Sequence, residues 1–599
     1  MTMKTSCLRP LLTILHGSQT GTATDVAKRI RRQAKSRRFP TELYAMNDFT
    51  TERLMTTNLI IFVASTTGQG EEPDNMKVFW RSLLRRRLPP NSLTNLEFAV
   101  LGLGDSSYQY FNFTSKRLHK RLLRLGAVAL YQLGLADDQH ELGFDGIAEP
   151  WIKGLFEALN EKFPLPAGVD EAAPVGPEPS FNVCLKDALE VPNVECSRLP
   201  VGPPYDAENP FHASVIANDR VTAAEHFQDV RLIKMDIAGS GFVYQPGDVM
   251  VVYPKNSLDQ VEELLTLLHL EGNQVITLSL HDEDAALPLP CRLSNPCTIR
   301  QAATNLWDFQ CVPRRSFFEL LHHFAVNERE KERLKEFASP EGTDELYGYC
   351  YRPRRTAFEI LQDFSDTRTR VPLEYWFDLF PPMQPRSFSI ASSPLRHQTV
   401  LHILVAVVQY KTKLQKPRMG LCSNYLKRVQ AGDSLDMWIK TGTMSFRAAS
   451  ERPVVMVGPG TGVAPFRSFI HDQAVRSHSG SILFFGCRNE DHDYYFREEW
   501  KELQEDGILV MMPPAFSRDQ IEKVYVQDRM KAASQLVFEA VYEQEGLFYL
   551  AGNAKQMPAD VTFALKRVLC ENSKMSMDDA DAYIQQMQKD GRYQTETWS

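Results

Sequence analysis

Two stretches of the chain alternate apolar, strand-like runs with amphipathic helical segments, and this alternation limits the possible folds more than any other feature. The first stretch extends from Leu11 to about Phe163 and contains LTIL, LIIFVAS, EFAVLGL and VALYQLGL. The second extends from Arg452 to the end and contains PVVMVGPGTGVAPFRSFI, GSILFFGCR, GILVMMPPAFSR and GLFYLAGNAKQM. Such alternation is typical of parallel sheets covered by helices on both faces. The sequence therefore predicts an α/β multidomain protein.

The region between these stretches has a different pattern. It carries β-like segments at both ends, HASVIANDRVTA and LHILVAVVQY, around a helical middle. The preceding run FPLPAGVDEAAPVGPEPSF is rich in Pro, Gly and acidic residues, which is typical of a linker. A chain of 599 residues has room for roughly three or four domains. We expect an α/β domain at 1–165, a linker at 166–202, a β-rich domain with a helical insertion at 203–450 and a second α/β domain at 451–599.

Composition excludes several protein classes. The 43% hydrophobic and 24% charged fractions are those of ordinary soluble proteins. The 10 cysteines are scattered, without a CxxC pair or zinc-type spacing, so the sequence indicates neither a disulfide framework nor a metal site. No run approaches the ~20 apolar residues of a membrane span, and the start MTMKTSCLRP lacks a secretory core. We expect a cytoplasmic protein without a membrane anchor.

The segment LTILHGSQTGTATDVAKRI is predicted to form a strand, an anion-binding loop and a helix. Backbone N–H groups at a helix N-terminus suit a phosphate. The loop has neither the GxxxxGK[ST] pattern nor the GxGxxG pattern. Its hydroxyl and amide donors, without a lysine, suit a single monoester phosphate such as that of flavin mononucleotide (FMN). The alternative is an ordinary strand-to-helix turn capped by Ser or Thr.

Two further loops, in FVASTTGQGEEPDN and AVLGLGDSSYQYFN, follow predicted strands of the same domain. Open α/β sheets bind ligands at the carboxyl ends of their strands, so the three loops are expected to form one pocket. Here the sequence resembles a flavodoxin-type domain. The resemblance implies that Tyr108 stacks on the flavin and Asp137 lies near its edge, whereas Thr67 stands where many relatives have a second aromatic residue. The candidate FMN-binding residues are Ser18, Gln19, Thr20, Gly21, Thr22, Ala23, Ser65, Thr66, Thr67, Gly68, Leu101, Gly102, Leu103, Gly104, Asp105, Ser106, Ser107, Tyr108, Gln109, Tyr110 and Asp137.

The middle region contains the motifs PRSFSIASSP and MGLCSNYL. A flavin diphosphate needs an arginine on its pyrophosphate, an aromatic side chain on its ring and a small hydroxyl near its reactive nitrogen, and Arg386, Phe388 and Ser389 provide this set. Alone, a strand with one arginine is commonplace, but the position of the motif before an α/β domain resembles the ferredoxin-reductase family. The candidate FAD-binding residues are Arg354, Arg386, Ser387, Phe388, Ser389, Gly420, Leu421, Cys422 and Ser423.

The last region contains VGPGTGVAPFR, whose glycines between a strand and a helix allow a pyrophosphate to approach the backbone. Downstream, FSRDQIEKVYVQ offers Arg518 and Lys523 to a 2′-phosphate, and it lacks the acid that would meet the ribose of NADH. The alternative is that both cations belong to a solvated helix face. The candidate NADPH-binding residues are Thr461, Ser517, Arg518, Lys523, Val524, Tyr525, Val526, Gln527, Asp560 and Trp598.

All three regions, in this order, resemble the diflavin reductases over essentially the whole chain. The resemblance implies a flavodoxin-like FMN domain, an FAD-binding β-barrel with a helical insertion, and a Rossmann-like NADP-binding domain whose C-terminal aromatic residue stacks on FAD. It implies catalytic roles for Ser389, Glu596 and Trp598. Relative to the P450-reductase pattern, Ala551 replaces a cysteine and Glu596 replaces an aspartate. Hydride transfer is therefore expected to depend more on Ser389.

Within that family the chain resembles the members that reduce an iron–sulfur protein, anamorsin, in cytosolic iron–sulfur cluster assembly. The resemblance implies FMN, FAD and NADPH as cofactors, an anamorsin-like iron–sulfur acceptor, and a monomer with no nucleic-acid or membrane partner. Two alternatives stay open, a general one-electron reductase of haem proteins and a flavin-bearing scaffold protein with an assembly role.

Charges in the first domain are sorted. Residues 1–165 contain 22 Lys and Arg and 16 Asp and Glu, whereas the whole chain has a net charge of −8. Acidic residues nevertheless occur in or beside the loops predicted to surround FMN. An acidic rim would steer a partner with a basic patch, and the alternative is that loops are simply polar. The rim residues are Glu71, Glu72, Asp74, Asp105, Asp137, Asp138, Glu141 and Asp145.

Overall fold

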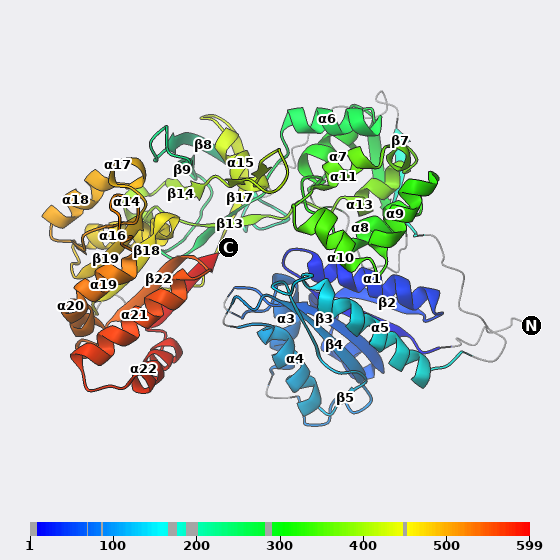
Figure 1. Cartoon of the computed structure of the whole chain (residues 1–599), viewed down its shortest axis with the longest axis horizontal. Coiled ribbons are helices and arrows are strands. Elements are labelled where there is room, and N and C mark those ends of the chain that lie inside the picture. Colours follow the sequence, from blue (N-terminus) through cyan, green and yellow to red (C-terminus); the bar gives the residue numbers. More distant parts are fainter. Residues whose placement is uncertain are drawn as a thin grey trace, which may run out of the picture. The chain divides into compact units, whose positions relative to one another are not determined.

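The computed structural model describes residues 9–68, 70–85, 88–108, 110–165, 177–186, 202–281, 290, 292–446 and 452–598 (Figure 1). The chain divides into two compact units. Unit 1 comprises Met1–Ser197, Asn256–Met383 and Thr412–Gln415, and unit 2 comprises Arg198–Lys255, Gln384–Lys411 and Lys416–Ser599. No helix among the described residues has the length and apolar character needed to cross a membrane.

The N-terminal part of unit 1 is a parallel sheet with strand order β2-β1-β3-β4-β5, in which β6 also pairs with β4. Two apolar clusters fill the two faces of this sheet, one beneath α1 and α5 and the other beneath α3 and α4. The predicted doubly wound domain is therefore confirmed. Its elements are β1 (Leu12–Gly17), α1 (Thr22–Ser36), β2 (Thr41–Ala45), α2 (Thr51–Thr56), β3 (Leu59–Ser65), α3 (Lys77–Leu83), β4 (Glu97–Gly104), α4 (Phe113–Arg124), β5 (Val128–Ala129), β6 (Gly134–Asp137) and α5 (Asp145–Lys162).

The rest of unit 1 is the predicted helical insertion, built around buried aromatic residues such as Trp307 and Trp376. Its small sheet has the order β12-β11-β7. Strand β7 lies inside 166–202, so part of the expected linker is a paired strand. The elements are β7 (Phe181–Lys186), α6 (Leu258–Leu268), β11 (Val275–Leu280), β12 (Cys297–Thr298), α7 (Ile299–Asn305), α8 (Arg315–His322), α9 (Glu328–Ala338), α10 (Thr343–Leu346), α11 (Ala357–Asp363), α12 (Ser365–Arg368) and α13 (Trp376–Leu379).

Unit 2 begins with an antiparallel sheet of order β13-β10-β17-β8-β9-β14. An isolated bridge between Ile390, directly after β13, and Ile403, in the middle of β14, links the two outer strands. The sheet thus curves around the apolar cluster that contains Met250, Leu401 and Leu435. The elements are β8 (Phe211–Arg220), β9 (Val230–Asp236), β10 (Val249–Val252), β13 (Arg386–Ser389), α14 (Pro394–His397), β14 (Val400–Ala406), β15 (Gln409–Tyr410), β16 (Arg418–Met419), α15 (Leu421–Arg428) and β17 (Ser434–Lys440).

The C-terminal part of unit 2 is a second parallel sheet, of order β20-β19-β18-β22-β23, with β21 pairing to β19. Helices α16 and α18 cover one face, and α19 to α22 cover the other. The predicted Rossmann-like domain is confirmed. Its elements are β18 (Val454–Pro459), α16 (Ala464–Arg476), β19 (Ser481–Cys487), α17 (Glu490–Asp493), α18 (Arg497–Glu505), β20 (Leu509–Met511), β21 (Ala515–Phe516), α19 (Val526–Ala532), α20 (Ser534–Phe538), β22 (Leu547–Asn553), α21 (Met557–Asn572), α22 (Met577–Lys589) and β23 (Tyr593–Trp598).

Candidate cofactor sites

The loop between β1 and α1 has the shape of a phosphate-binding turn. Gly21 precedes the helix with a φ of 87°, a conformation that favours glycine. The Ser18 hydroxyl accepts hydrogen bonds from the N–H groups of Gly21 at 3.0 Å and Ala23 at 3.2 Å, which closes the loop on itself. Gln19 is held by Asp74, whose N–H donates to Gln19 Oε1 at 3.0 Å. The first N–H groups of α1 have no partners inside the helix, so the turn offers donors to an anion.

The second loop lies beside the third at the carboxyl edge of the sheet. The Thr66 N–H donates to the Leu103 carbonyl at 3.1 Å, and Ser65 Oγ donates to the Gly17 carbonyl at 3.3 Å. These bonds join all three predicted loops. Thr66 Oγ1 is buried and makes no hydrogen bond within the described residues. A buried hydroxyl without a partner is costly, which fits a polar ligand such as a flavin at this position.

Several residues predicted to bind FMN in the third loop can offer a ligand only their backbone groups. The side chains of Leu101 and Leu103 are buried in the core, so they cannot face a ligand. A Cβ on Gly102 would come within 2.6 Å of Ser115 Oγ, so packing against α4 requires a glycine there. Tyr108 is half-buried, and Gln109 lies outside the described residues.

Asp137 organises the end of β6. Its Oδ1 accepts hydrogen bonds from the N–H groups of Ser106 at 2.9 Å and Gln139 at 3.0 Å. Burial raises the pKa of Asp137, but these hydrogen bonds outweigh it and hold the pKa below its ordinary value. A carboxylate is thus fixed at the same edge of the sheet as the three loops, and its position beside the flavin stays a prediction.

The FAD motifs occupy β13 and the start of α15. Arg386 and Ser387 are exposed, and Phe388 packs partly into the apolar cluster of the antiparallel sheet. Cys422 is buried in that cluster, and Ser423 Oγ accepts a hydrogen bond from the Val408 N–H at 3.0 Å. The side chains of Cys422 and Ser423 therefore serve packing, and what this segment offers a ligand is the N–H groups at the start of the helix.

Arg354 differs from the other predicted FAD residues because it belongs to unit 1. It has a φ of 56°, in the left-handed region. Burial raises the pKa of Asp138, and the positive charge of Arg354 opposes that rise. Its role toward FAD stays a prediction.

The end of β23 brings Glu596 against Ser389. Ser389 Oγ donates a hydrogen bond to Glu596 Oε1 at 2.6 Å, joining residues far apart in the sequence. Glu596 Oε2 is buried and has no hydrogen-bond partner within the described residues. Burial raises the pKa of Glu596, although the hydrogen bond from Ser389 opposes the shift. This unpaired oxygen fits a polar ring edge placed beside Ser389.

The loop after β18 contains glycines whose lack of a side chain allows close contacts to its backbone. Gly460 has a φ of 57°, and a Cβ on Gly462 would lie 2.1 Å from the Ala551 carbonyl oxygen. Thr461 lies between these two glycines. Ala551 pairs in register with Glu596, so the loop lies beside the strands that carry the Ser389–Glu596 pair. The chemistry of this loop fits a nucleotide pyrophosphate.

The predicted 2′-phosphate residues follow β19 and β21. The N–H of Ser517 donates to Cys487 and that of Arg518 to Arg488. Arg518 and Lys523 are exposed, and Tyr525 is exposed at the start of α19. The sequence analysis did not name Arg488, although it could have been found as an arginine that directly follows a predicted parallel strand. Val526 is buried in the core, so its side chain cannot contact a ligand as the prediction implied.

The remaining predicted residues lie after β22 and at the end of β23. Asp560 is half-buried in the first turn of α21, where its carboxylate accepts from Gln556 Nε2 at 2.9 Å. Trp598 is half-buried and packs against the cluster that contains Phe466 and Tyr549. Its carbonyl accepts from the Ala554 N–H at 2.8 Å. The terminal aromatic residue is therefore fixed in the sheet.

Comparisons with known proteins agree with this arrangement. The flavodoxin family matches residues 14–151, the FAD binding domain family matches residues 203–425, and the oxidoreductase NAD-binding domain family matches residues 456–562. These matches confirm the predicted order of a flavodoxin domain, an FAD-binding domain and a nicotinamide-nucleotide domain, and with it FMN, FAD and NADPH as cofactors.

Relatives match along nearly the whole chain. Proteins named NADPH-dependent diflavin oxidoreductase 1 from Danio rerio and Xenopus laevis are 46% and 45% identical, each covering 98% of this chain and 99% of the relative. The protein of that name from Schizosaccharomyces pombe is 35% identical with the same coverage. Electrons therefore pass from NADPH through FAD to FMN in this protein. The chain belongs to the NADPH-dependent diflavin oxidoreductases.

Proposed function

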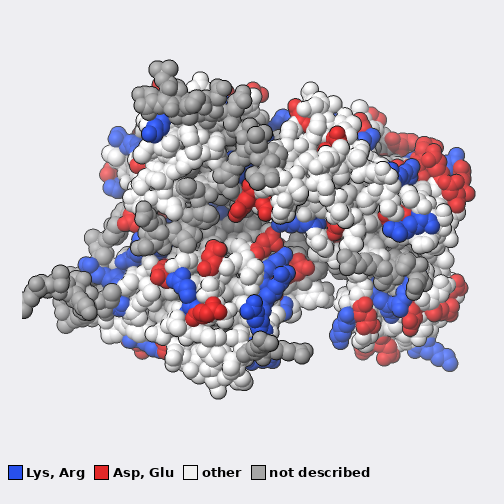
Figure 2. Space-filling model, turned by 180° about the vertical axis from the view of Figure 1, so that it is seen from behind, with Lys and Arg blue, Asp and Glu red and all other residues white. Residues whose placement is uncertain are grey.

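We propose that this protein delivers electrons one at a time from its FMN site to an anamorsin-like iron–sulfur protein, as part of cytosolic iron–sulfur cluster assembly. The observation that carries the acceptor proposal is the set of carboxylates at the edge of the three FMN loops. Asp145 was predicted to belong to this rim, but it is 2% exposed and lies in a buried cluster with Arg29 and Arg315, so it is not part of it. Figure 2 shows Lys and Arg next to Asp and Glu over the same face of the molecule. Because both signs of charge are mixed on this face, its net charge does not orient a partner. A local acidic rim can.

The residues at the hydride-transfer site have distinct roles in the proposal. Bound FAD would supply the hydride acceptor for NADPH, and bound FMN would take up and release the electrons one at a time. Ser389 holds Glu596, and the unpaired Oε2 of Glu596 would stabilise positive charge on a nicotinamide bound beside it. Gly460, which has open space where a Cβ would lie, would let the backbone approach the pyrophosphate, while Arg518 and Lys523 would hold the 2′-phosphate.

We also propose functional domains at 1–165, 203–450 and 451–599, because each of the three family matches falls within one of these ranges. A cytoplasmic location is supported by the seven cysteines of the described residues, all of them free thiols, which suit a reducing compartment. We also propose that the protein is a monomer.

The structure refines which acidic residues can test docking. Asp74 holds Gln19 in the phosphate loop, and Glu72 pairs with Arg117 at 3.1 Å. Changing either residue would disturb the FMN site or the fold. Glu71 and Glu141 are exposed and beside the loops, so they are the better choices.

Reversing both charges, Glu71→Lys with Glu141→Lys, should slow electron transfer to the acceptor by roughly tenfold at low ionic strength, because steering of a basic partner is lost. Reduction of FAD by NADPH should be unchanged. The matched control is Glu157→Lys with Glu161→Lys, which places the same double reversal on the far half of α5. Stopped-flow traces at rising salt measure the effect. A transfer rate equal to that of the control would contradict docking at the rim.

Comparing acceptors tests the proposed function itself. The NADPH-reduced protein is mixed anaerobically with an anamorsin-like iron–sulfur protein and, separately, with a haem protein. The proposal expects faster saturable reduction of the iron–sulfur protein. Preferential reduction of the haem protein would favour a general reductase, and no transfer to either would favour a scaffold role.

A further inference from the structure

Arg314, immediately before α8 in the helical insertion, lies on the FMN phosphate loop. Its Nη2 donates hydrogen bonds to the Thr20 carbonyl and to Thr22 Oγ1, each at 3.1 Å. A Cβ on Gly21 would lie 3.8 Å from the same nitrogen, so the guanidinium faces the bend of the loop. A residue about 290 positions away in the sequence therefore adds a positive charge to a loop that has no lysine.

Helix α8 lies along α1, and both helices begin at the same end. Ser316 donates to Asp25 Oδ1 in the first turn of α1. Farther along, Glu319 accepts from Arg29 Nε at 3.0 Å and from Arg32 Nη2 at 2.7 Å. These contacts on successive turns set the position of α8, and with it the position of Arg314.

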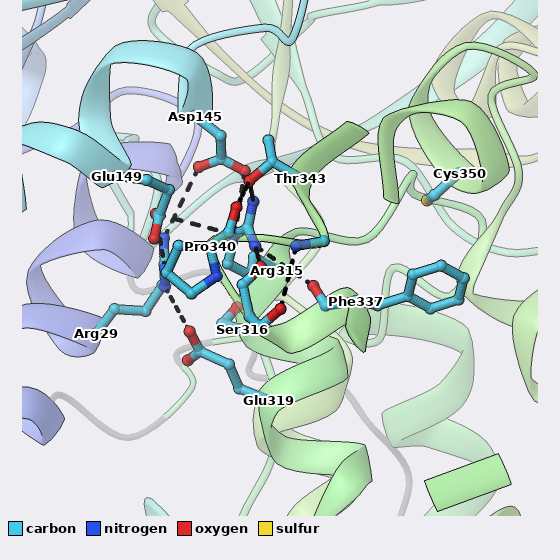
Figure 3. Close-up of polar contacts among 12 residues, drawn as sticks. Arg29, Asp145, Glu149, Arg315, Ser316, Glu319, Phe337, Pro340, Thr343 and Cys350 are labelled. Carbon is cyan, nitrogen blue, oxygen red and sulfur yellow. Dashed lines mark hydrogen bonds and ion pairs between the residues drawn. The ribbon is translucent and has the colours of Figure 1, made fainter. Parts of the chain in front are cut away.

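Arg315, the residue next to Arg314, holds the start of α8 in place through buried polar contacts. Arg315 is 1% exposed and lies between Asp145 and Glu149 of α5, with its Nε 3.6 Å and 3.9 Å from their carboxylates (Figure 3). Its Nη2 donates to Thr343 Oγ1 at 2.7 Å. Arg29, 2% exposed, completes the cluster through Glu149 at 2.7 Å. Burial of these charges leaves them few alternative positions, so the backbone that carries Arg314 is held firmly.

We propose that Arg314 is a ligand of the FMN phosphate supplied by the helical insertion, and that FMN binding is thereby coupled to the contact between α1 and α8. Within the described residues, Arg314 forms no ion pair, and its hydrogen bonds use only Nη2. A guanidinium has five N–H donors in a fork that matches phosphate geometry. The remaining donors are therefore available to the phosphate oxygens.

The coupling between FMN binding and the α1–α8 contact acts in both directions. If docking of α8 brings Arg314 to the phosphate, docking raises FMN affinity, and bound FMN strengthens the contact by the same factor. Asp25 places a carboxylate in the first turn of α1, and its negative charge disfavours the binding of a phosphate beside it. Arg314 offsets that charge.

The test measures the dissociation constant of FMN after reversible removal of the flavin from the full chain, by fluorescence quenching. Arg314→Gln should weaken FMN binding by about 10- to 100-fold, the loss expected for one charge-assisted hydrogen bond, and Arg314→Lys should weaken it less. The matched control Arg370→Gln changes an exposed arginine of the same insertion and should leave the constant unaltered. FAD content should be unchanged in all three variants.

Salt and riboflavin separate a phosphate ligand from a merely structural residue. The deficit of Arg314→Gln should narrow as ionic strength rises, and the variant should lose far less affinity for riboflavin, which has no phosphate. A Glu319→Gln variant, which loosens α8 at a distance from the loop, should also weaken FMN. An FMN constant equal to that of the control, or an equal and salt-independent loss for FMN and riboflavin, would overturn the ligand role. Unaltered FMN affinity in Glu319→Gln would overturn the coupling.

Discussion

Replacing Ser389 by alanine should slow hydride transfer from NADPH to FAD by about 100-fold or more, a typical loss for a group that positions a reacting carboxyl. Ser389 Oγ is the hydrogen-bond donor that fixes Glu596 Oε1 at 2.6 Å, so the variant frees a buried carboxyl group. Binding of FAD should persist, because backbone donors and Arg386 remain. Single-turnover absorbance at the flavin wavelength measures the rate.

The matched control for this variant is Ser434→Ala, which removes an exposed hydroxyl from another strand of the same sheet. Its hydride-transfer rate should equal that of the unaltered protein. If Ser389→Ala transferred hydride as fast as this control, the Ser389–Glu596 pair would have no role in the chemistry.

The pH dependence should identify Glu596 as the titrating partner. Burial raises the pKa of Glu596, and the carboxylate form is the one that stabilises positive charge on the nicotinamide. The hydride-transfer rate should therefore fall as the pH is lowered, with a midpoint above the ordinary carboxyl value of about 4.3. In Glu596→Gln this fall should be absent and the rate low throughout. A pH profile identical in both proteins would contradict the assignment.

Neutralising Arg518 and Lys523 together should weaken NADPH binding by about 100-fold or more and leave NADH nearly unchanged. Each cation is exposed beside the carboxyl edge of the last sheet, and each contributes a charge-assisted hydrogen bond worth about 1.5 to 3 kcal/mol to a 2′-phosphate. NADH lacks that phosphate, so it loses nothing. The kcat/KM values for both donors, measured at fixed ionic strength, report the change.

Lys589→Ala is the control for this pair, because it removes an exposed cation at the end of α22 in the same domain. It should alter neither donor. Equal losses for NADPH and NADH in the double variant would show that the 2′-phosphate binds elsewhere. Arg488, whose carbonyl holds the Arg518 N–H at 2.8 Å, would then be the next residue to change.

Local patterns predicted most of the fold and much of each site. The parallel strands read as apolar runs because both faces of each sheet are buried, and the cofactor loops follow those strands directly. Motif spacing therefore located Ser18, Ser389 and Thr461 at the correct strand ends. Strand β7 was missed because its pairing with β11 joins segments about 90 residues apart, and its Pro- and Gly-rich surroundings are typical of a linker.

The direction of individual side chains was the other feature that the sequence could not predict. Cys422 and Val526 fall inside motifs, but the helices that contain them turn both side chains into the core. Arg314 carries no local signal, since its contact with Thr22 depends on how α8 lies along α1. Such contacts follow from tertiary packing, which neither periodicity nor spacing encodes.

Removing FMN while retaining FAD tests the central claim, that electrons leave the protein through the FMN site. The FMN-depleted protein is mixed rapidly and anaerobically with NADPH and an iron–sulfur acceptor, before and after FMN is restored. FAD should be reduced at the rate seen in the complete protein, and acceptor reduction should be lost and then recovered with added FMN. Acceptor reduction at an undiminished rate without FMN would contradict the account.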